Sequence, residues 1–379
     1  MENFIAYNPV KLHFGKNVTN ELGNVAASYG KNILLIYGRG SVKKHGYYDI
    51  IVKQLKSVNC KIFEFSGIKP NPLVDDVDAA VNYASDKSID AIVALGGGSV
   101  IDSAKIISVC IPGNYKGWDI MKRKVIPGAA VPVIAILTLA ATGTEMNPNA
   151  VLQNPLTMEK IGYNNQHTFP AHSFLDPQFT FSVPPEQTAY GIIDLIAHAL
   201  ENFFGEGESN LSDLFISSII RDAIHYGPLV MKEPRNYDYR ANIMWDATCA
   251  LNGVTGWGKA SGDWGVHAIG HQLSMLYDLP HGATLSIAYP AWLKLQLERI
   301  PERIQTLGKH IYNNENAKET IDNLTSFFSS LNGPVSLTEV LIGNDKKTEI
   351  INLMNKNKVS GFYHKLSDND HMLLVNLMM

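Results

Sequence analysis

The sequence predicts an α/β N-terminal domain followed by an all-α C-terminal domain, and two observations carry this prediction. In the first half, short apolar runs rich in β-formers alternate with helical patterns: "KNILLIYG", "CKIFEF", "IDAIVALGGGS" and "VPVIAILTLA". Such alternation is typical of a parallel sheet wrapped by helices. After Pro184 and Pro185 the strand signal ends, and long helical segments follow, among them "GIIDLIAHALENFF", "LSDLFISSIIRDAI" and "RANIMWDATCALNG". We therefore expect domains at residues 1–184 and 185–379.

Two further local patterns refine the first domain. Between its second and third apolar runs, four apolar residues recur at helical spacing and indicate a crossover helix: Leu73, Val77, Val81 and Ala84. Asn71 and Pro72 form a suitable entry to that helix. The segment "VLQNPLTMEKIGY" predicts a hairpin around its Asn-Pro turn.

Composition narrows the functional classes. The 379 residues are 45% hydrophobic and 18% charged, and 32 basic against 36 acidic residues give a formal net charge of -4. This balance argues against a nucleic-acid or anionic-membrane partner. Cys60, Cys110 and Cys249 form no close pair, so we expect no disulfide framework and a reducing cytoplasm. The apolar stretch "AAVPVIAILTLAA" is short and interrupted by Pro132, which indicates a buried strand and no membrane span.

A glycine-rich turn follows the third apolar run. "GGGS", from Gly96 to Ser99, opens a helical pattern that contains Asp102. Glycines at a strand-to-helix turn let the backbone approach a phosphate, and the helix N-terminus supplies N–H groups and a favourable dipole. The spacing is not the usual dinucleotide fingerprint, so a plain tight turn is the alternative.

A threonine-rich turn follows the fourth run. "TLAATGTEMN", from Thr138 to Asn147, carries three threonines and Glu145. Ligands collect at the carboxyl ends of parallel strands, so these hydroxyls could contact a ribose or a pyrophosphate. Capping of local structure is the competing interpretation.

Two histidine motifs lie in the helical half. "DLIAH" places Asp194 and His198 at i and i+4 on one helix face, which is a plausible half of a divalent metal site or else an ordinary ion pair. "HAIGHQLSMLYDLPH" adds His267, His271 and His281. Helical spacing pairs His267 with His271, whereas a chain that folds back after "DLP" pairs His267 with His281. Spacing alone does not decide between these two pairings.

In combination, "GGGSVIDSAK", "TLAATGTEMN", "DLIAHALE" and "HAIGHQLSMLYDLPHG" resemble the iron-containing (group III) alcohol dehydrogenases, particularly the butanol-dehydrogenase-like branch. The resemblance spans nearly the whole chain. It implies an N-terminal dinucleotide-binding α/β domain and a helical metal-binding domain, an architecture shared with dehydroquinate synthase. It also implies a homodimer.

The resemblance assigns roles to individual residues. It implies that a divalent metal, iron(II) or zinc, is bound by four residues: Asp194, His198, His267 and His281. His271 would then be the catalytic residue beside the metal, facing substrate and nicotinamide. Seven positions match the family's cofactor-binding cleft: Gly97, Gly98, Ser99, Asp102, Thr138, Leu139 and Lys160.

The implied activity is oxidation and reduction of short straight-chain alcohols and aldehydes, such as butanol and butanal, with a nicotinamide cofactor. A lyase or cyclase of the dehydroquinate synthase type is the alternative, but such an enzyme needs basic residues to hold an acidic substrate. The segment "NGVTGWGKASGDWGVHAIGH" offers only Lys259 as a cation, which favours an uncharged substrate. Trp257, Trp264 and Leu273 could line an apolar pocket.

The end of the first apolar run indicates whether NAD(H) or NADP(H) is the cofactor. An acidic residue there would hold the ribose 2′-hydroxyl of NAD and repel the phosphate of NADP. This sequence instead has Arg39, flanked by Gly38, Gly40 and Ser41. An arginine fork can bind a phosphate through two hydrogen bonds, and Lys43 or Lys44 could add charge. We therefore expect NADP(H) over NAD(H), with a solvated loop as the alternative.

Overall fold

The computed structural model describes residues 1–379 and confirms the predicted fold class. The chain divides into two compact units. One spans Asn8–Val183, and the other combines Met1–Tyr7 with Pro184–Met379. The first seven residues, which we had expected to lie with the α/β domain, belong to the helical unit, where the backbone N–H of Glu2 donates to the carbonyl of Gly258 at 2.8 Å.

A six-stranded parallel sheet forms the centre of the α/β unit, in the order β1-β8-β5-β4-β2-β3. The four predicted apolar runs become β2 (Asn32–Tyr37), β3 (Lys61–Ser66), β4 (Ala91–Gly96) and β5 (Val133–Leu137). The four-residue strands β1 (Lys11–Phe14) and β8 (His172–Leu175) extend the sheet beyond β5. The predicted hairpin is present as the antiparallel pair β6 (Asn149–Asn154) and β7 (Glu159–Asn164).

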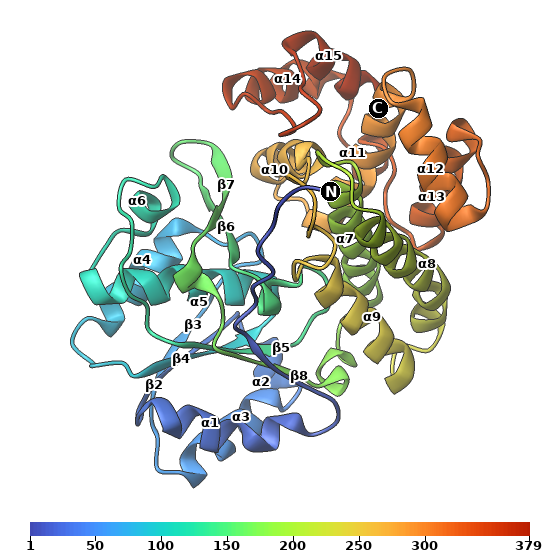
Figure 1. Cartoon of the computed structure of the whole chain (residues 1–379). Coiled ribbons are helices and arrows are strands. Elements are labelled where there is room, and N and C mark those ends of the chain that lie inside the picture. The colour runs from blue at the N-terminus through green and yellow to red at the C-terminus, as the bar shows by residue number, and fades with distance from the viewer. The chain divides into compact units, whose positions relative to one another are not determined.

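Helices cover both faces of this sheet (Figure 1). On one face, α1 (Leu22–Tyr29) and α3 (Tyr47–Ser57) pack Leu22, Ile51 and Leu55 onto buried residues of β2 and β4. On the other lie α4 (Val74–Ala84), which is the predicted crossover helix, and α5 (Gly98–Cys110). The short helices α2 (Ser41–Lys44) and α6 (Gly117–Met121) complete the unit. Because β2, β4 and β5 are neighbours, the segments that follow them meet at one edge of the sheet.

The helical unit is built around α7 (Pro185–Phe203), which contacts α8 (Asn210–Lys232), α9 (Tyr237–Ala250) and α11 (His281–Gln296). α10 (Gly265–Tyr277) packs against α11. The unit continues with α12 (Pro301–Tyr312), α13 (Ala317–Ser330), α14 (Lys347–Lys356) and α15 (Asp368–Leu377). Almost all of α7 after its first turn is buried, so its side chains face other helices.

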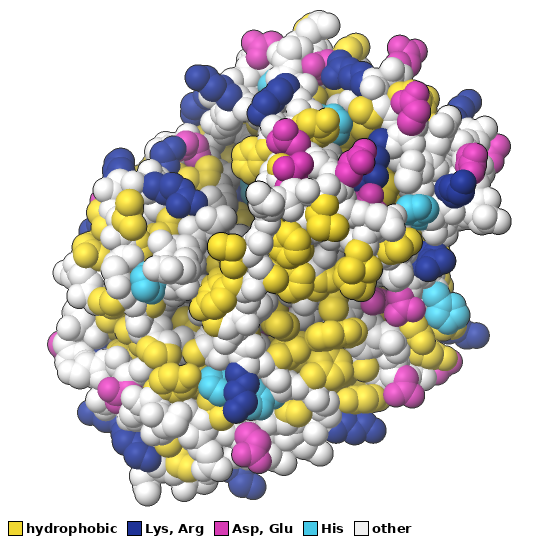
Figure 2. All heavy atoms as spheres, in the orientation of Figure 1, with side chains coloured by type: hydrophobic (Ala, Val, Ile, Leu, Met, Phe, Trp, Pro, Cys, Tyr) yellow, Lys and Arg dark blue, Asp and Glu magenta, His cyan; other side chains and the backbone are white.

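The surface carries charges of both signs. Figure 2 shows basic and acidic side chains interspersed on the visible face, and hydrophobic side chains gathered where Figure 1 draws α7, α8 and α9. Leu211, Leu214 and Phe215 of α8 and Trp245 of α9 are among the exposed apolar residues. None of the helices has the length and hydropathy needed to cross a lipid bilayer.

Candidate metal centre and cofactor-binding edge

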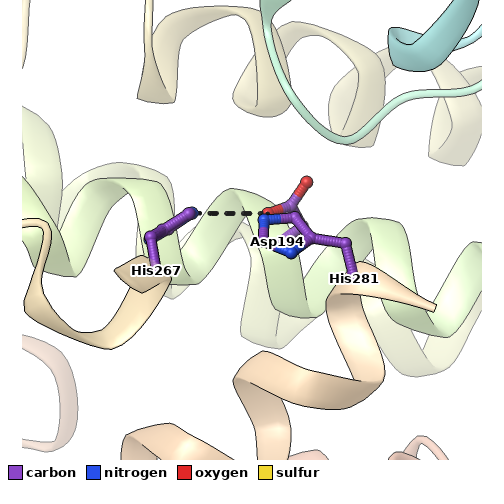
Figure 3. A group of neighbouring side chains, drawn as sticks. All are labelled: Asp194, His267 and His281. Atoms are coloured by element: carbon purple, nitrogen blue, oxygen red, sulfur yellow. Dashed lines mark ion pairs between the residues drawn. The ribbon is translucent and has the colours of Figure 1, made fainter. Parts of the chain in front are cut away.

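Three helices of the helical unit bring a carboxylate and two imidazoles together. Asp194 lies on α7, His267 on α10, and His281 is the first residue of α11. One ligand atom from each lies within 4.8 Å of the other two. The Nε2 atoms of His267 and His281 are 3.8 and 3.7 Å from Asp194 Oδ1. Figure 3 shows the three side chains pointing toward one another.

The break between α10 and α11 explains how His281 reaches this point. α10 ends at Tyr277, and Asp278 turns the chain in a left-handed conformation with φ of 50°. Pro280 then precedes α11, whose first turn carries His281. The centroids of the His281 and His267 rings consequently lie 5.2 Å apart. The group around Asp194 thus contains His267 and His281, and His271 is outside it.

His198 stands next to this group. It lies one helical turn after Asp194, and its Nδ1 is 3.6 Å from Asp194 Oδ1. Its ring stacks on that of His267 with centroids 4.7 Å apart. The group of three does not include His198, so the structure places this expected ligand beside the others.

The residues present fit a divalent cation. Asp194 Oδ1 and His267 Nε2 are buried and have no hydrogen-bond partner. Buried polar atoms in that state cost free energy unless another group satisfies them, and a cation at the centre would do so. Imidazole and carboxylate ligands suit both iron(II) and zinc.

The charge environment of His267 is consistent with this interpretation. Burial disfavours the charged imidazole, but the negative charges of Asp194 and Glu201, together with the hydrogen bond to Glu201, outweigh burial and raise the pKa of His267 to about 9. The same two carboxylates that stabilise a proton here would stabilise a divalent cation. Protons and metal therefore compete for this imidazole.

Two buried carboxylates that are not among the expected site residues lie near the centre, and one of them contacts His267 directly. Glu201 on α7 accepts a hydrogen bond from the His267 backbone N–H at 2.9 Å, and its Oε1 is 2.8 Å from His267 Nδ1. Asp263 accepts hydrogen bonds from the backbone N–H groups of Tyr363 and His364. Burial raises the pKa of Asp263 to about 6, with the charge of Glu201 adding to the shift. The spacing of Glu201, seven residues after Asp194, was the available signal.

His271 and Trp264 border the centre. His271 is half-buried one turn after His267, and its ring centroid lies 5.5 Å from that of His281. The indole of Trp264 lies 5.3 Å from the His267 ring and 6.2 Å from the His198 ring. Leu273, which we expected at a pocket wall, is fully buried and therefore packs within the helical core.

At the edge of the sheet, the glycine-rich and threonine-rich turns lie against each other. The backbone N–H of Thr138 donates to the carbonyl of Gly96 at 3.0 Å. A Cβ on Gly98 would lie 2.9 Å from the side chain of Thr142, and one on Gly97 would lie 3.3 Å from Leu139 Cβ. These glycines therefore permit the close approach of the two turns at the carboxyl ends of β4 and β5.

Asp102 lies beneath these turns and bonds to protein groups. Its Oδ1 accepts from the Thr144 hydroxyl at 2.6 Å, and its Oδ2 accepts from the backbone N–H of Val151 at 2.9 Å. Burial raises the pKa of this carboxyl. Lys105, one turn further along α5, is fully buried, and its Nζ donates to Thr144 Oγ1 at 2.6 Å and to the Asn147 carbonyl at 2.8 Å.

Two other expected cofactor residues also have protein partners. The Ser99 hydroxyl donates to the carbonyl of Pro70 at 2.6 Å. Lys160, on β7, is buried and donates to Asn71 Oδ1 at 2.9 Å. The first contact connects the β3–α4 segment to the glycine-rich turn, and the second connects the same segment to β7.

The segment Gly38–Ser41 follows β2. Arg39 is exposed and makes no hydrogen bond or ion pair, and Gly40 has φ of 143°, a value that favours glycine. Lys43 is engaged with other groups: its Nζ lies 3.6 Å from Glu64 Oε2 and 4.4 Å from the centroid of the Tyr48 ring. Arg39 is therefore more available to an anion than Lys43.

Lys259, the one cation near the metal motif in sequence, is also engaged. It is buried, and its Nζ lies 2.8 Å from Asp213 Oδ1. Arg303 contacts the other oxygen of Asp213 at 2.7 Å. This ion-pair network occupies Lys259, which leaves it unavailable to hold an acidic substrate.

The α/β unit has a parallel sheet with a glycine-rich turn of the kind that can bind phosphate, and the helical unit has a carboxylate–histidine centre. Together these features define the class of metal-binding, dinucleotide-linked oxidoreductases. Residues 9–177 match the iron-containing alcohol dehydrogenase family, and residues 188–373 match the C-terminal region of the Fe-containing alcohol dehydrogenase family. The chain belongs to the iron-containing alcohol dehydrogenase family. It is thus an NAD(P)-dependent alcohol dehydrogenase or aldehyde reductase.

Individual relatives agree with this assignment. The chain is 36% identical over 379 residues to the probable NADH-dependent butanol dehydrogenase 1 of Bacillus subtilis, covering 98% of both proteins. It is 34% identical over 350 residues, 89% of each protein, to the NADPH-dependent aldehyde reductase YqhD of Escherichia coli. The crystal structure of NADH-dependent butanol dehydrogenase A from Thermotoga maritima superposes with a TM-score of 0.96 at 35% identity, covering 100% of this chain and 99% of that one.

Proposed function

We propose that this enzyme is an NADP(H)-linked reductase of short straight-chain aldehydes such as butanal, and that it favours aldehyde reduction over alcohol oxidation. The observation that carries the proposal is the convergence of Asp194, His267 and His281, two of which have buried ligand atoms without a hydrogen-bond partner. The names of the relatives, butanol dehydrogenase and aldehyde reductase, support the substrate class.

Each part of the proposed site has a separate task. Asp194, His198, His267 and His281 hold the divalent metal, which when bound supplies a Lewis acid that polarises a carbonyl oxygen. His271 lies next to these ligands and serves the proton transfer without holding the metal. The nicotinamide supplies the hydride, while the glycine-rich turn and the helix N-terminus that follows it position the pyrophosphate.

Apolar surroundings support an uncharged substrate. Trp264 packs against two histidines of the centre, and Lys259 is neutralised by Asp213. Apolar walls discriminate chain length by only about 1 to 3 kcal/mol per methylene. We therefore expect activity over a range of aldehyde lengths.

The preference for NADP(H) rests on Arg39. Its guanidinium is exposed and unpaired at the end of β2, where it can form charge-assisted hydrogen bonds with a 2′-phosphate. Relatives of both kinds exist: the Bacillus subtilis protein is named as NADH-dependent and the Escherichia coli protein as NADPH-dependent. The residue at this position is therefore our basis for choosing between the cofactors.

The test is anaerobic purification followed by loading with iron(II) or zinc and metal analysis. Aldehydes of two to eight carbons are then assayed with NADPH and with NADH, and the corresponding alcohols with the oxidised cofactors. We expect turnover of butanal, faster with NADPH than with NADH. Metal-loaded protein that reduces none of these aldehydes with either cofactor would refute the proposal. Light scattering on the same sample tests the homodimer that we also propose from the family resemblance.

A further inference from the structure

Glu201 is a buried carboxylate that the proposed chemistry does not use directly. It lies on α7 seven residues after Asp194 and three after His198, so all three side chains project from the same face of the helix. Only 1% of its surface is exposed. A carboxylate buried to this extent requires compensating donors or charges.

The carboxylate of Glu201 contacts two nitrogen atoms of a single residue, His267. Its Oε1 accepts from the backbone N–H of His267 at 2.9 Å and lies 2.8 Å from Nδ1 of the same imidazole. His267 is the third residue of α10, so its N–H is one of the donors that the helix itself leaves unsatisfied. Glu201 therefore caps α10 from a different helix and places negative charge at its positive end.

The contact between Glu201 and Nδ1 of the His267 ring determines whether the other ring nitrogen, Nε2, is free to bind a metal. When Nδ1 carries a proton and donates it to Glu201, Nε2 presents its lone pair on the opposite side of the ring. Nε2 faces Asp194 Oδ1 at 3.8 Å and has no hydrogen-bond partner. The carboxylate also increases the electron density of the ring, which strengthens an Nε2 ligand.

We propose that Glu201 is the positioning residue of the metal centre: it holds His267 in the Nδ1–H tautomer, directs Nε2 at the metal and raises metal affinity. This inference rests on the proposed metal site. It goes beyond the ligand set because Glu201 acts only through His267. In Glu201→Gln the shape is kept and the charge is lost, and the amide NH₂ can donate to Nδ1, which would place the ring proton on Nε2 and block the ligand atom.

The experiment measures Zn²⁺ affinity of metal-free protein by chelator competition, in wild type, Glu201→Gln and a control. Asp370→Asn is the matched control, because Asp370 is another buried carboxylate of this unit whose partners, Arg299 and Ser367, lie outside the centre. Loss of a carboxylate that orients a ligating histidine weakens metal binding by about 10- to 100-fold. We expect that loss in Glu201→Gln and an unchanged dissociation constant in Asp370→Asn.

Separate outcomes distinguish the two proposals. If wild type binds Zn²⁺ and Glu201→Gln binds it equally well, the role of Glu201 is refuted and the metal site stands. If wild type binds no divalent metal, both proposals fail.

A measurement on wild type covers the case in which Glu201→Gln does not fold. Nitrogen-15 chemical shifts of labelled histidines in the Zn²⁺-loaded protein report which ring nitrogen carries the proton. We expect His267 to be protonated at Nδ1 and to bind through Nε2, with the resonance assigned by comparison with His267→Gln. Zinc bound at Nδ1 would overturn the inference.

Discussion

At the scale of single residues, three histidines close together in the sequence have different surroundings. His267 and His281 each place Nε2 within 4 Å of Asp194 Oδ1, at 3.8 and 3.7 Å, whereas His271 lies outside the group. Replacing His267 or His281 by Ala removes a coordinating atom, so both variants should lose most of their metal. Metal content per chain after anaerobic purification measures this loss.

His271→Ala should behave in the opposite way. It should retain its metal and lose about 10²- to 10⁴-fold in kcat, because a positioned proton-transfer group contributes rate without contributing a ligand. His310→Ala, which removes a half-buried histidine of α12 that contacts Ser217, is the control and should retain both metal and rate. Loss of metal from the His271 variant alone would reverse the assignment.

A second prediction at this scale concerns Arg39. Arg39→Asp should lower kcat/KM for NADPH by about 10- to 100-fold, because a hydrogen bond to a charged group contributes about 1.5 to 3 kcal/mol. Steady-state kinetics with both cofactors measures the effect, with the exposed residue Arg221 changed to Asp as the control. A wild-type preference for NADH, or an unchanged cofactor ratio in Arg39→Asp, would show that Arg39 does not contact the 2′-phosphate.

At the scale of secondary-structure elements, α5 joins the glycine-rich turn to the segment that follows β5. The ammonium of Lys105 is buried and contacts Thr144, Asn147 and the Asn149 carbonyl, the last at 2.7 Å. Lys105→Met would leave these acceptors and Asp102 without their cation, and breaking a buried pair costs about 3 to 5 kcal/mol. We expect a lower midpoint of unfolding for the α/β unit and a higher KM for the cofactor.

Circular dichroism in denaturant and cofactor titrations test the Lys105 prediction. Lys87→Met is the control, since Lys87 pairs with Asp86 in an exposed segment away from these turns. The surface pair should contribute no more than about 1 kcal/mol. If Lys105→Met were as stable as the control, the network would not hold the two segments together.

The helix α9 contains a carboxyl whose burial opposes ionisation. Burial, with a contribution from the charge of Asp222, raises the pKa of Asp246 to about 8, and its Oδ2 has no hydrogen-bond partner. The folded state thus binds this proton more tightly than the unfolded state, whose Asp pKa is about 3.9. The associated stability is complete below about pH 4 and is lost as pH rises toward 8.

Asp246→Asn should therefore raise the melting temperature relative to wild type at pH 8, by about 2 to 4 °C per kcal/mol gained, and the difference should shrink toward pH 5. Asp370→Asn is expected to have the opposite sign at neutral pH: burial raises the pKa of Asp370, but Arg299 and the hydrogen bonds from Ser367 outweigh burial and lower it. Thermal unfolding at pH 5, 6.5 and 8 compares the two. A difference for Asp246→Asn that does not depend on pH would contradict the assigned burial.

At the scale of the whole molecule, patterns of consecutive residues were predictable and contacts between distant residues were not. β2, β4 and β5 are buried on both faces and appear as continuous apolar runs, and β3 is a partly exposed edge strand. β1 and β8, in contrast, are four-residue strands that contain histidines. Asp102 matched a cofactor motif, but its partners Thr144 and Val151 are 42 and 49 residues away. The choice between His271 and His281 depended on the turn at Asp278, which helical periodicity cannot specify.

The division into units makes a prediction about metal removal. The candidate ligands come from α7, α10 and α11 alone, and the sheet of the α/β unit contributes none. A ligand that binds only the native state stabilises it by RT ln(1 + [L]/Kd), and local opening that breaks the site loses this stabilisation. Removing the metal should therefore speed amide hydrogen exchange in α7, α10 and α11, while β2, β4 and β5 keep their protection.

Exchange followed by mass spectrometry, on Zn²⁺-loaded and chelator-treated protein, reads each segment separately. Glu201 connects α7 to α10 with or without metal through the His267 backbone N–H, so we expect α10 to keep partial protection in the metal-free protein. In Glu201→Gln that remaining protection should fall, because a neutral amide at the N-terminus of α10 interacts less favourably with the helix dipole. Equal deprotection of both units on chelation would mean that they unfold as one cooperative body, in which case the stabilisation by metal is not confined to the helices that bind it.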